Sequence, residues 1–303
     1  MDHQFEASIQ IIVPGGHLRR AWALPGGVSA HVTALEVQTA NGATQTYVVR
    51  QHHRDRVAKE AQILQLLQSQ RVPVPRLYHT QLAEPAFLIE AFIDGEPNFD
   101  PDNIDAYVIT MAHSLAQIHT VDVRTVDLSF APLIADFCTQ KLDNPPEHFH
   151  ERLHEREVRA ALQAHQHVVT HNAAVLLHGD FWPGNVLWRG DQVQAVIDWE
   201  DAALGDPLAD VANSRREMLW FFGRDAMQRF TEAYRAQMPH IDYTHLPYWD
   251  LCMGLRPVGQ MSSWCLDAAK KARFEERYRW FVQAAITQLS RRNAAHHEDF
   301  THP

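Results

Sequence analysis

The stretch that decides the fold is residues 175–200, which read VLLHGDFWPGNVLWRGDQVQAVIDWE. It contains three short apolar runs of strand-forming residues, at 175–177, 186–188 and 193–197. The last two runs are joined by Arg-Gly-Asp-Gln at 189–192, a composition typical of a tight turn between paired strands. The pattern therefore predicts a β-hairpin formed by the last two runs, preceded by one short strand and a polar loop.

Three polar side chains flank the predicted hairpin. Asn185 comes directly before its first strand and Asp198 directly after its second, so pairing brings both to the same end, beside the loop with Asp180. An Asp that accepts a proton, with an Asn and a second Asp as hard oxygen ligands, matches phosphoryl transfer, in which Mg²⁺ bridges nucleotide phosphates. Taken singly, each residue is also an ordinary turn residue. Together, at this spacing and between apolar strands, they predict a catalytic site.

The residues around this trio resemble the catalytic core of a known family. The matching residues are His178-Gly-Asp180, Asn185, Ile-Asp-Trp-Glu at 197–200, Gly-Asp-Pro at 205–207 and Asp210. This pattern resembles the aminoglycoside phosphotransferase family, whose fold is similar to that of protein kinases. The resemblance implies an enzyme that moves the γ-phosphoryl group of ATP or GTP to a hydroxyl of a small molecule. It implies Asp180 as the catalytic base, and Asn185 and Asp198 as ligands of Mg²⁺. Asp206 and Asp210 would support the segment that follows.

The first part of the chain carries candidate nucleotide contacts. In the resembled family a glycine-containing loop lies above the nucleotide, and Gly26 and Gly27 occupy that place here, with a plain turn as the alternative. Arg50 ends a strand-like run where kinases place Lys, and its planar guanidinium can still pair with phosphate oxygens. Glu60 falls on the apolar face of a helix predicted for residues 55–70, so it needs a partner, for which Arg50 is best placed. The alternative leaves Glu60 solvated at the rim of that face.

Two lobes are predicted, 1–93 and 94–303. Apolar runs separated by turns, among them an Asn-Gly turn, predict a small antiparallel sheet in the first lobe, with its first strand at residues 8–13. The second lobe is mainly helical and begins with an amphipathic helix over residues 104–119. These elements predict an α+β fold with a small antiparallel-sheet N-lobe and a larger, mainly helical C-lobe. The family resemblance implies that this is a bilobal protein-kinase-like fold, with nucleotide binding in the N-lobe and catalysis and substrate binding in the C-lobe.

The hinge between these lobes is predicted at residues 90–94. By the resemblance, its backbone groups hydrogen-bond the adenine ring of the nucleotide. Glu90 and Phe92 are therefore candidate nucleotide-binding residues.

Composition excludes several classes of protein. A chain of 303 residues with a formal net charge of −10 can form two lobes, but it lacks the excess of basic residues that a nucleic-acid partner requires. It has no run of 18 or more apolar residues and no basic-then-apolar leader, so we expect a cytoplasmic protein without a membrane partner. The 3 cysteines have no metal-ligand spacing and are expected to be reduced thiols. The oligomeric state is left open by the sequence.

Two alternatives to a phosphotransferase remain. A metal-dependent hydrolase would use His178 as a ligand or base beside Asp180 and Asp198, but no second well-spaced His accompanies it. His178 is therefore expected to orient the loop. The other alternative is a catalytically inactive nucleotide-binding regulatory protein, against which the intact trio argues.

Charge gives an indication of the acceptor. Residues 94–303 hold 19 basic against 30 acidic residues. Three of these acids closely follow the predicted metal ligand: Glu200, Asp201 and Asp206. A focused negative field favours an amine-bearing acceptor, such as an aminoglycoside or another amino sugar. The alternative is that these acids cap helices and pair with Arg215 or Arg216.

Overall fold

The computed structural model describes residues 5–24, 31–125, 128–165, 172–260 and 267–299. The chain divides into two compact units. The first unit comprises Met1–Asn98, Arg124–Phe130 and Gly184–Glu200, and the second comprises Phe99–Val123, Ala131–Pro183 and Asp201–Pro303. The segment that carries the hairpin thus belongs with the first unit, and the predicted lobe boundary between residues 93 and 94 stays a prediction.

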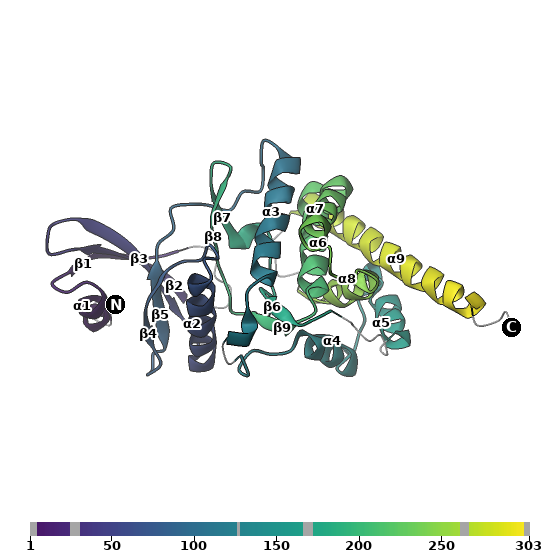
Figure 1. Ribbon diagram of the computed structural model, residues 1–303, viewed down its shortest axis with the longest axis horizontal. Helices are drawn as coiled ribbons and strands as arrows, with labels where there is room; N and C mark the ends of the chain where they lie inside the picture. The colour runs from purple at the N-terminus through teal and green to yellow at the C-terminus, as the bar shows by residue number, and fades with distance from the viewer. Residues whose placement is uncertain (1–4, 25–30, 126–127, 166–171, 261–266, 300–303) are drawn as a thin grey trace. The chain divides into compact units, whose positions relative to one another are not determined.

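The first unit is built on a five-stranded antiparallel sheet (Figure 1). In sheet order its strands are β1 (His17–Ala23), β2 (His31–Gln38), β3 (Thr44–Gln51), β5 (Phe87–Ala91) and β4 (Leu77–Gln81). The predicted Asn41-Gly42 turn joins β2 to β3, and the pairing of these two strands runs without a register shift from Gln38 to His31. The prediction of a small antiparallel sheet in this part of the chain is confirmed.

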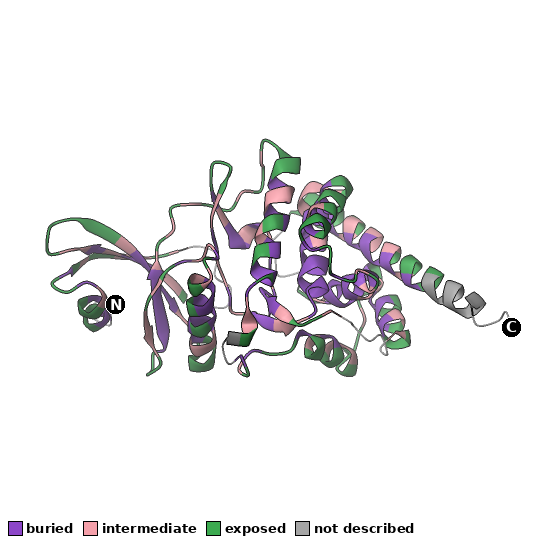
Figure 2. Cartoon of the chain, in the orientation of Figure 1, coloured by how far each residue is buried: buried purple, intermediate pink, exposed green. Residues whose placement is uncertain are grey.

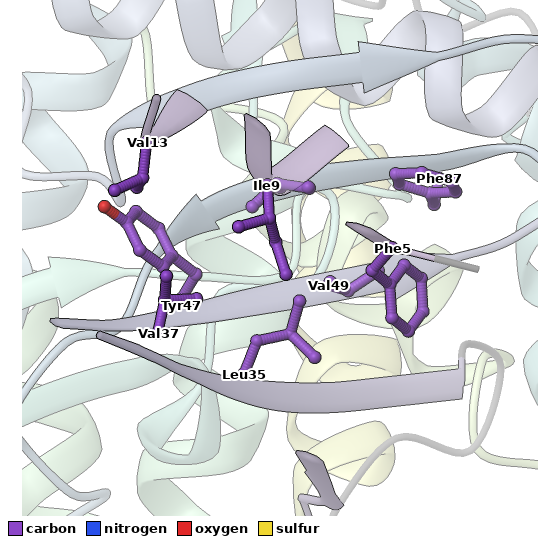
Figure 3. Packing of buried hydrophobic residues seen from close by; sticks show 9 residues of the cluster. Phe5, Ile9, Val13, Leu35, Val37, Tyr47, Val49 and Phe87 are labelled. Atoms are coloured by element: carbon purple, nitrogen blue, oxygen red, sulfur yellow. The ribbon is translucent and has the colours of Figure 1, made fainter. Parts of the chain in front are cut away.

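A short helix, and not a strand, precedes this sheet. Residues 8–13 were predicted as the first strand, but α1 spans Glu6–Ile12, so that prediction is wrong. The reason is the spacing of Phe5, Ile9 and Val13, which recur every four residues and share one helical face. Figure 3 shows these side chains packed on sheet residues of the same core cluster, which contains Leu35, Val37, Tyr47, Val49, Phe87 and Ile89. Full burial of each large apolar side chain contributes roughly 1.5–3 kcal/mol, which stabilises α1 as a helix on the sheet.

The opposite face of the sheet is covered by α2 (Arg54–Ser69), which contacts β4 and β5. Successive side chains of a strand point to opposite faces, so Val49 faces the α1 core while Arg50 faces α2. Arg50 is paired across the ladder with Leu88, which gives Leu88 and Glu90 the same face as Arg50. The sheet geometry thus turns two charged residues, Arg50 and Glu90, toward the helix that carries Glu60.

The predicted hairpin is present in the first unit. Strands β7 (Val186–Arg189) and β8 (Gln192–Val196) pair antiparallel around a turn in which Gly190 has a φ of 57°. The Ile197 amide donates to the Asn185 carbonyl (2.9 Å), which extends the pairing by one residue pair. The hairpin therefore holds the residues that flank its two strands at one end, as its sequence predicts.

The second unit is mainly helical. Its helices are α3 (Ile104–His119), α4 (Ile134–Asp143), α5 (Glu155–Ala164), α6 (Leu208–Phe222), α7 (Arg224–Gln237), α8 (Leu246–Gly254) and α9 (Ala268–Asp299). Helix α3 has the predicted bounds and packs on α7, while α6 packs on α7 and α8. Figure 2 shows buried and exposed residues alternating along α3, as expected for an amphipathic helix. Short 3-10 turns lie at Val123–Thr125, Glu151–Leu153 and Pro183–Asn185. The sheet unit and this helical unit together confirm the α+β class.

Two short strands complete the second unit and position the loop that follows. Strand β6 (Val175–Leu177) pairs antiparallel with β9 (Ala203–Gly205), with Leu177 opposite Ala203. This pairing brings the residues just after β6 beside the residues just before β9. Gly179 and Asp201 are consequently in close backbone contact.

The cysteines differ from the prediction of reduced thiols. Cys138 in α4 and Cys252 in α8 form a disulfide across 114 residues of sequence, with their Cα atoms 5.7 Å apart. The sequence could not indicate this pair because only the packing of the helices brings the two positions together.

Within the described residues, none of the helices combines the length and the apolar character needed to cross a membrane.

Candidate active site

A buried charge cluster lies in the first unit at the end of β3. The Arg50 Nε lies 3.3 Å from Glu60 Oε1, and its Nη2 donates to Asp198 Oδ1 at 2.5 Å. Arg50 and Glu60 are both buried, with side-chain exposures of 10% and 6%. The predicted ion pair between β3 and α2 is therefore present, and the alternative of a solvated Glu60 is wrong. Because its guanidinium also reaches Asp198, Arg50 joins the strand, the helix and the end of the hairpin.

The charge balance of this cluster shifts the pKa values of its members. Burial alone lowers the pKa of Arg50, but the nearby carboxylates of Glu60, Glu90 and Asp198 outweigh burial and raise it, so Arg50 stays charged. Burial raises the pKa of Glu60, against the attraction of Arg50. Burial also raises the pKa of Glu90 to about 8 despite Arg50, because Glu60 and Asp198 add negative charge nearby. At neutral pH the cluster thus contains a fixed cation and a Glu90 that is largely protonated.

The two predicted metal ligands lie at the open end of the hairpin. Asn185 is buried, and the backbone pairing between Asn185 and Ile197 places Asp198 one residue further on. Asp198 has a φ of 69°, a left-handed conformation that costs a non-glycine residue roughly 1–3 kcal/mol and is typical of functional sites. The prediction that the hairpin brings Asn185 and Asp198 to one end is confirmed by this pairing.

This pair of oxygen donors fits a magnesium ion. Mg²⁺ prefers hard oxygen ligands and is commonly held by one or two carboxylates together with substrate phosphates. Asp198 offers a carboxylate and Asn185 an amide oxygen, and the adjacent Arg50 can accommodate phosphate charge. Among the residues that the structure describes, no group of three or more His, Cys, Asp or Glu side chains is placed to hold a metal ion.

The loop with the predicted base belongs to the second unit and is fixed by Asp210. The Asp210 carboxylate accepts from the backbone N–H groups of His178 (2.7 Å) and Gly179 (2.9 Å). It also contacts His119 Nε2 at 3.2 Å, and His119 Nδ1 lies 2.6 Å from the Tyr234 hydroxyl. Burial acts to raise the pKa of Asp210, but these hydrogen bonds and the charges of His119 and His178 lower it. Asp210 thus remains an ionised anchor for the loop.

Two further features shape this loop. Gly179 has a φ of 80°, and a Cβ atom at this position would collide with the Asp201 carbonyl group, so a side chain is excluded. The Asp180 amide donates to His178 Nδ1 at 3.2 Å, which is the orienting role expected for that histidine. Asp180 follows directly, with a side chain that is 33% exposed.

The sequence prediction gave no role to two residues that contact this loop or its anchor. His119 ends the apolar stripe of its helix and is only 3% exposed, and a histidine on such a stripe indicates a buried polar partner. Arg256 follows α8, and no motif indicated it. Its guanidinium donates to the Gly179 carbonyl and to the Asp201 carboxylate, and it lies 3.6 Å from Asp180.

The three acids expected to attract a cationic acceptor all have partners. Glu200 lies 3.5 Å from Arg56, and Asp201 pairs with Arg256. Asp206 is buried, which raises its pKa, and it accepts from the Leu208 amide (2.9 Å) at the start of α6. The acids therefore cap and pair, as the alternative held, although the expected partners are wrong: Arg215 pairs with Asp250 and Arg216 with Glu217.

Several predicted site residues are not brought together by these contacts. Gly26 and Gly27 lie outside the described residues. Phe92 is 40% exposed, and its amide lies 3.4 Å from the Thr46 carbonyl. Asp180 belongs to the second unit while the hairpin residues belong to the first, so their convergence stays a prediction.

The model of the phosphotransferase enzyme family, APH, matches residues 23–245 of the chain. The chain belongs to this family. The match covers β2 to β5 of the sheet, the hairpin and the loop described above, and it confirms the predicted enzyme class, a small-molecule phosphotransferase.

Curated relatives resemble only part of the chain. The human acyl-CoA dehydrogenase family member 11 is 24% identical over 201 residues, covering 58% of this chain and 26% of that protein. The mouse acyl-CoA dehydrogenase family member 10 is 27% identical over 176 residues, covering 52% of this chain and 16% of that protein. The chain therefore spans about a quarter or less of the length of these relatives.

Solved structures of phosphotransferases share the fold. A thermostable variant of the aminoglycoside phosphotransferase APH(4)-Ia, bound to AMP-PNP and hygromycin B, has a TM-score of 0.65 at 18% identity, covering 93% of this chain and 97% of that one. Macrolide 2'-phosphotransferase MphH from Brachybacterium faecium has a TM-score of 0.62 at 16% identity, covering 92% and 98%. Amicoumacin kinase hAmiN, bound to AMP-PNP, Ca²⁺ and Ami, has a TM-score of 0.64 at 12% identity, covering 94% of each chain. These likenesses confirm the predicted kinase-like fold.

Proposed function

We propose that this phosphotransferase moves the γ-phosphoryl group of ATP or GTP to a hydroxyl group of a small molecule. Asp180 is the catalytic base, and Asn185 and Asp198 hold Mg²⁺. Arg50 contacts the nucleotide phosphates, and Glu60 orients Arg50. The observation that carries this proposal is the buried Arg50, which pairs with Glu60 on one side and donates to Asp198 on the other.

The nucleotide contacts continue from this cluster. Arg50 replaces the lysine usual in kinases, and its planar fork can bind two phosphate oxygens at once. Gly26 and Gly27 supply backbone N–H groups above the phosphates. The backbone of Glu90 and Phe92 holds the purine ring. Support for this last assignment is that Glu90 lies one residue before the end of β5, the strand beside the one that carries Arg50, and that Phe92 directly follows β5.

The proposed chemistry is divided between the residues that hold Mg²⁺ and phosphate and the loop that carries Asp180. Mg²⁺ would be held by Asn185 and Asp198 and would neutralise phosphate charge during the transfer. The acceptor oxygen forms a bond to the γ-phosphorus, the bond from that phosphorus to the nucleoside diphosphate breaks, and Asp180 takes the hydroxyl proton. Positioning is what this chain supplies: Asp210 fixes the base loop through two backbone N–H groups, and Glu60 fixes the Arg50 guanidinium.

Two acceptor classes are supported by different observations. Structures that share the fold bind antibiotics such as hygromycin B, which supports an amine-bearing sugar or a related metabolite. The curated relatives carry the name acyl-CoA dehydrogenase, which supports a hydroxyl-bearing acyl thioester of coenzyme A. Because Glu200, Asp201 and Asp206 are engaged in pairs and caps, charge attraction of a cation no longer favours the first class over the second.

The test is a screen for acceptor-dependent release of ADP from ATP. The panel contains hygromycin B, a macrolide, a free amino sugar and 3-hydroxybutyryl-CoA, each with its deoxy analogue as a control, with Mg²⁺ present and absent. We expect one class to raise ADP release above the rate with water, only with Mg²⁺, and its phosphorylated product to appear by mass spectrometry. Phosphate release that no acceptor changes would instead support a hydrolase, and nucleotide binding without turnover would support an inactive regulatory protein.

A further inference from the structure

Arg256 follows α8 and reaches the loop that carries Asp180. One terminal nitrogen donates to the Gly179 carbonyl, and the other donates to the Asp201 carboxylate. The second nitrogen also lies 3.6 Å from Asp180 Oδ1, an ion-pair distance that is too long for a hydrogen bond. All of these residues belong to the second unit.

The segment that carries Arg256 is anchored in the core of this unit. The Met253 carbonyl accepts from Arg216 (2.5 Å), and the Gly254 carbonyl accepts from the Tyr278 hydroxyl (3.0 Å). Tyr278 in α9 is fully buried, and Cys252 in α8 is joined by its disulfide to α4. A guanidinium group is thus presented to the loop from a rigid support.

The contacts made by Arg256 complement those made by Asp210. Asp210 accepts from the N–H of Gly179, and Arg256 donates to its carbonyl, so both backbone polar groups of this residue are held by charged side chains. The next residue in the chain is Asp180. Charge-assisted hydrogen bonds are roughly twice as strong as neutral ones, so the two peptide groups that flank Gly179, the residue before Asp180, are each held firmly by a charged side chain.

We propose that Arg256 is a positioning residue for Asp180. It fixes the backbone before the base and faces the base carboxylate with a positive charge at an ion-pair distance. This inference rests on the proposed role of Asp180 as the base. Asp201 in turn holds the guanidinium of Arg256 in place.

Kinetics of Arg256→Ala and Arg256→Lys test the proposal, with ADP release from Mg·ATP measured for water and for the fastest acceptor of the panel. A displacement of a reacting group by about 1 Å costs about 100-fold, so we expect Arg256→Ala to lower kcat by about 10- to 100-fold while KM for ATP changes by less than about threefold. Arg256→Lys keeps the charge but cannot hold both oxygen partners in one plane. Its kcat should therefore lie between that of wild type and that of Arg256→Ala. The matched control is Arg156→Ala, which removes an arginine from an exposed pair with Glu151.

A double-mutant cycle with Asp180→Asn separates positioning from mere stabilisation. Without the base, Arg256→Ala should change the remaining turnover by less than about twofold. The proposal would be overturned if Arg256→Ala lowered kcat by the same factor in wild type and in Asp180→Asn. It would also be overturned if Arg256→Ala folded and kept the wild-type kcat. If Arg256→Ala does not fold, as shown by its thermal melt, Arg256→Lys and Asp201→Asn decide in its place, and wild-type kcat in both overturns it. If Asp180→Asn itself keeps wild-type turnover, the assigned base is wrong, whereas an inactive Asp180→Asn beside a fully active Arg256→Ala refutes the positioning role alone.

Discussion

Substitution of Glu90 by Gln changes how the stability of the first unit depends on pH. Glu90 is 6% exposed and lies on the same face of the sheet as Arg50, near the carboxylates of Glu60 and Asp198. Burial raises its pKa from an ordinary value of 4.5 to about 8. The native protein therefore holds a proton on Glu90 at pH values where the unfolded chain has lost it.

The sign and size of the effect follow from this difference in bound protons. Between about pH 4.5 and pH 8 the native state binds more protons than the unfolded state, so the free energy of unfolding falls as the pH rises. The stability that the Glu90 proton contributes is fully present below about pH 4.5 and is lost as the pH rises to about 8. Above about pH 8 the contribution of Glu90 no longer changes with pH. One pKa unit corresponds to about 1.4 kcal/mol, so Glu90 alone accounts for a loss of about 2 to 3 kcal/mol between about pH 6 and pH 8.

Urea unfolding at a series of pH values measures this contribution. Glutamine has nearly the shape of a protonated glutamate but does not titrate, so Glu90→Gln should become more stable relative to wild type as the pH rises from 6 to 9. The matched control is Glu84→Gln, an exposed position in the same unit, which should follow the wild-type profile. Parallel profiles for wild type and Glu90→Gln would show that Glu90 is ionised in the native state and would refute the reasoning.

Further predictions concern the cluster and the cysteines. Arg50→Ala and Glu60→Ala should each weaken ATP binding, and the double variant should bind no worse than the weaker single one, because each change alone disables the same contact; strictly additive losses by calorimetric titration would contradict this. Asp198→Ala should remove the dependence of ATP affinity on Mg²⁺, and titrations with and without Mg²⁺ that match wild type would exclude Asp198 from the metal site. Thiol titration of the denatured, unreduced protein should detect one of the 3 cysteines, since Cys138 and Cys252 are paired, and detection of all three would contradict the disulfide.

The local parts of the site could be predicted from sequence. The hairpin follows from two apolar runs around a glycine turn, whereas the register shift between Leu187 and Trp188 was not predicted. The pairing of Glu60 with Arg50 also followed, because helical periodicity placed a carboxylate on a buried face next to a strand that ends in arginine. Both inferences depend on neighbours in sequence or on a single packing contact.

Other features depend on packing that no short pattern records. Residues 8–13 were predicted as a strand from their own apolar run, which does not include Phe5. The spacing of Phe5 from Ile9 and Val13 is what indicates the helix. Arg256 reaches Gly179 across 77 residues, and its position depends on how α8 packs. The hinge prediction for Glu90 considered only its backbone, so it did not indicate the buried carboxyl group beside Arg50.

The measurement that tests the central claim most directly compares wild type and Asp180→Asn for ADP release with the fastest acceptor of the panel, alongside ATP affinity measured in the presence of Mg²⁺. A positioned base contributes about 10²- to 10⁴-fold, so turnover should fall by that factor while ATP affinity stays within about threefold of wild type. Wild-type turnover in a folded Asp180→Asn variant would contradict the account of Asp180 as the base for phosphoryl transfer.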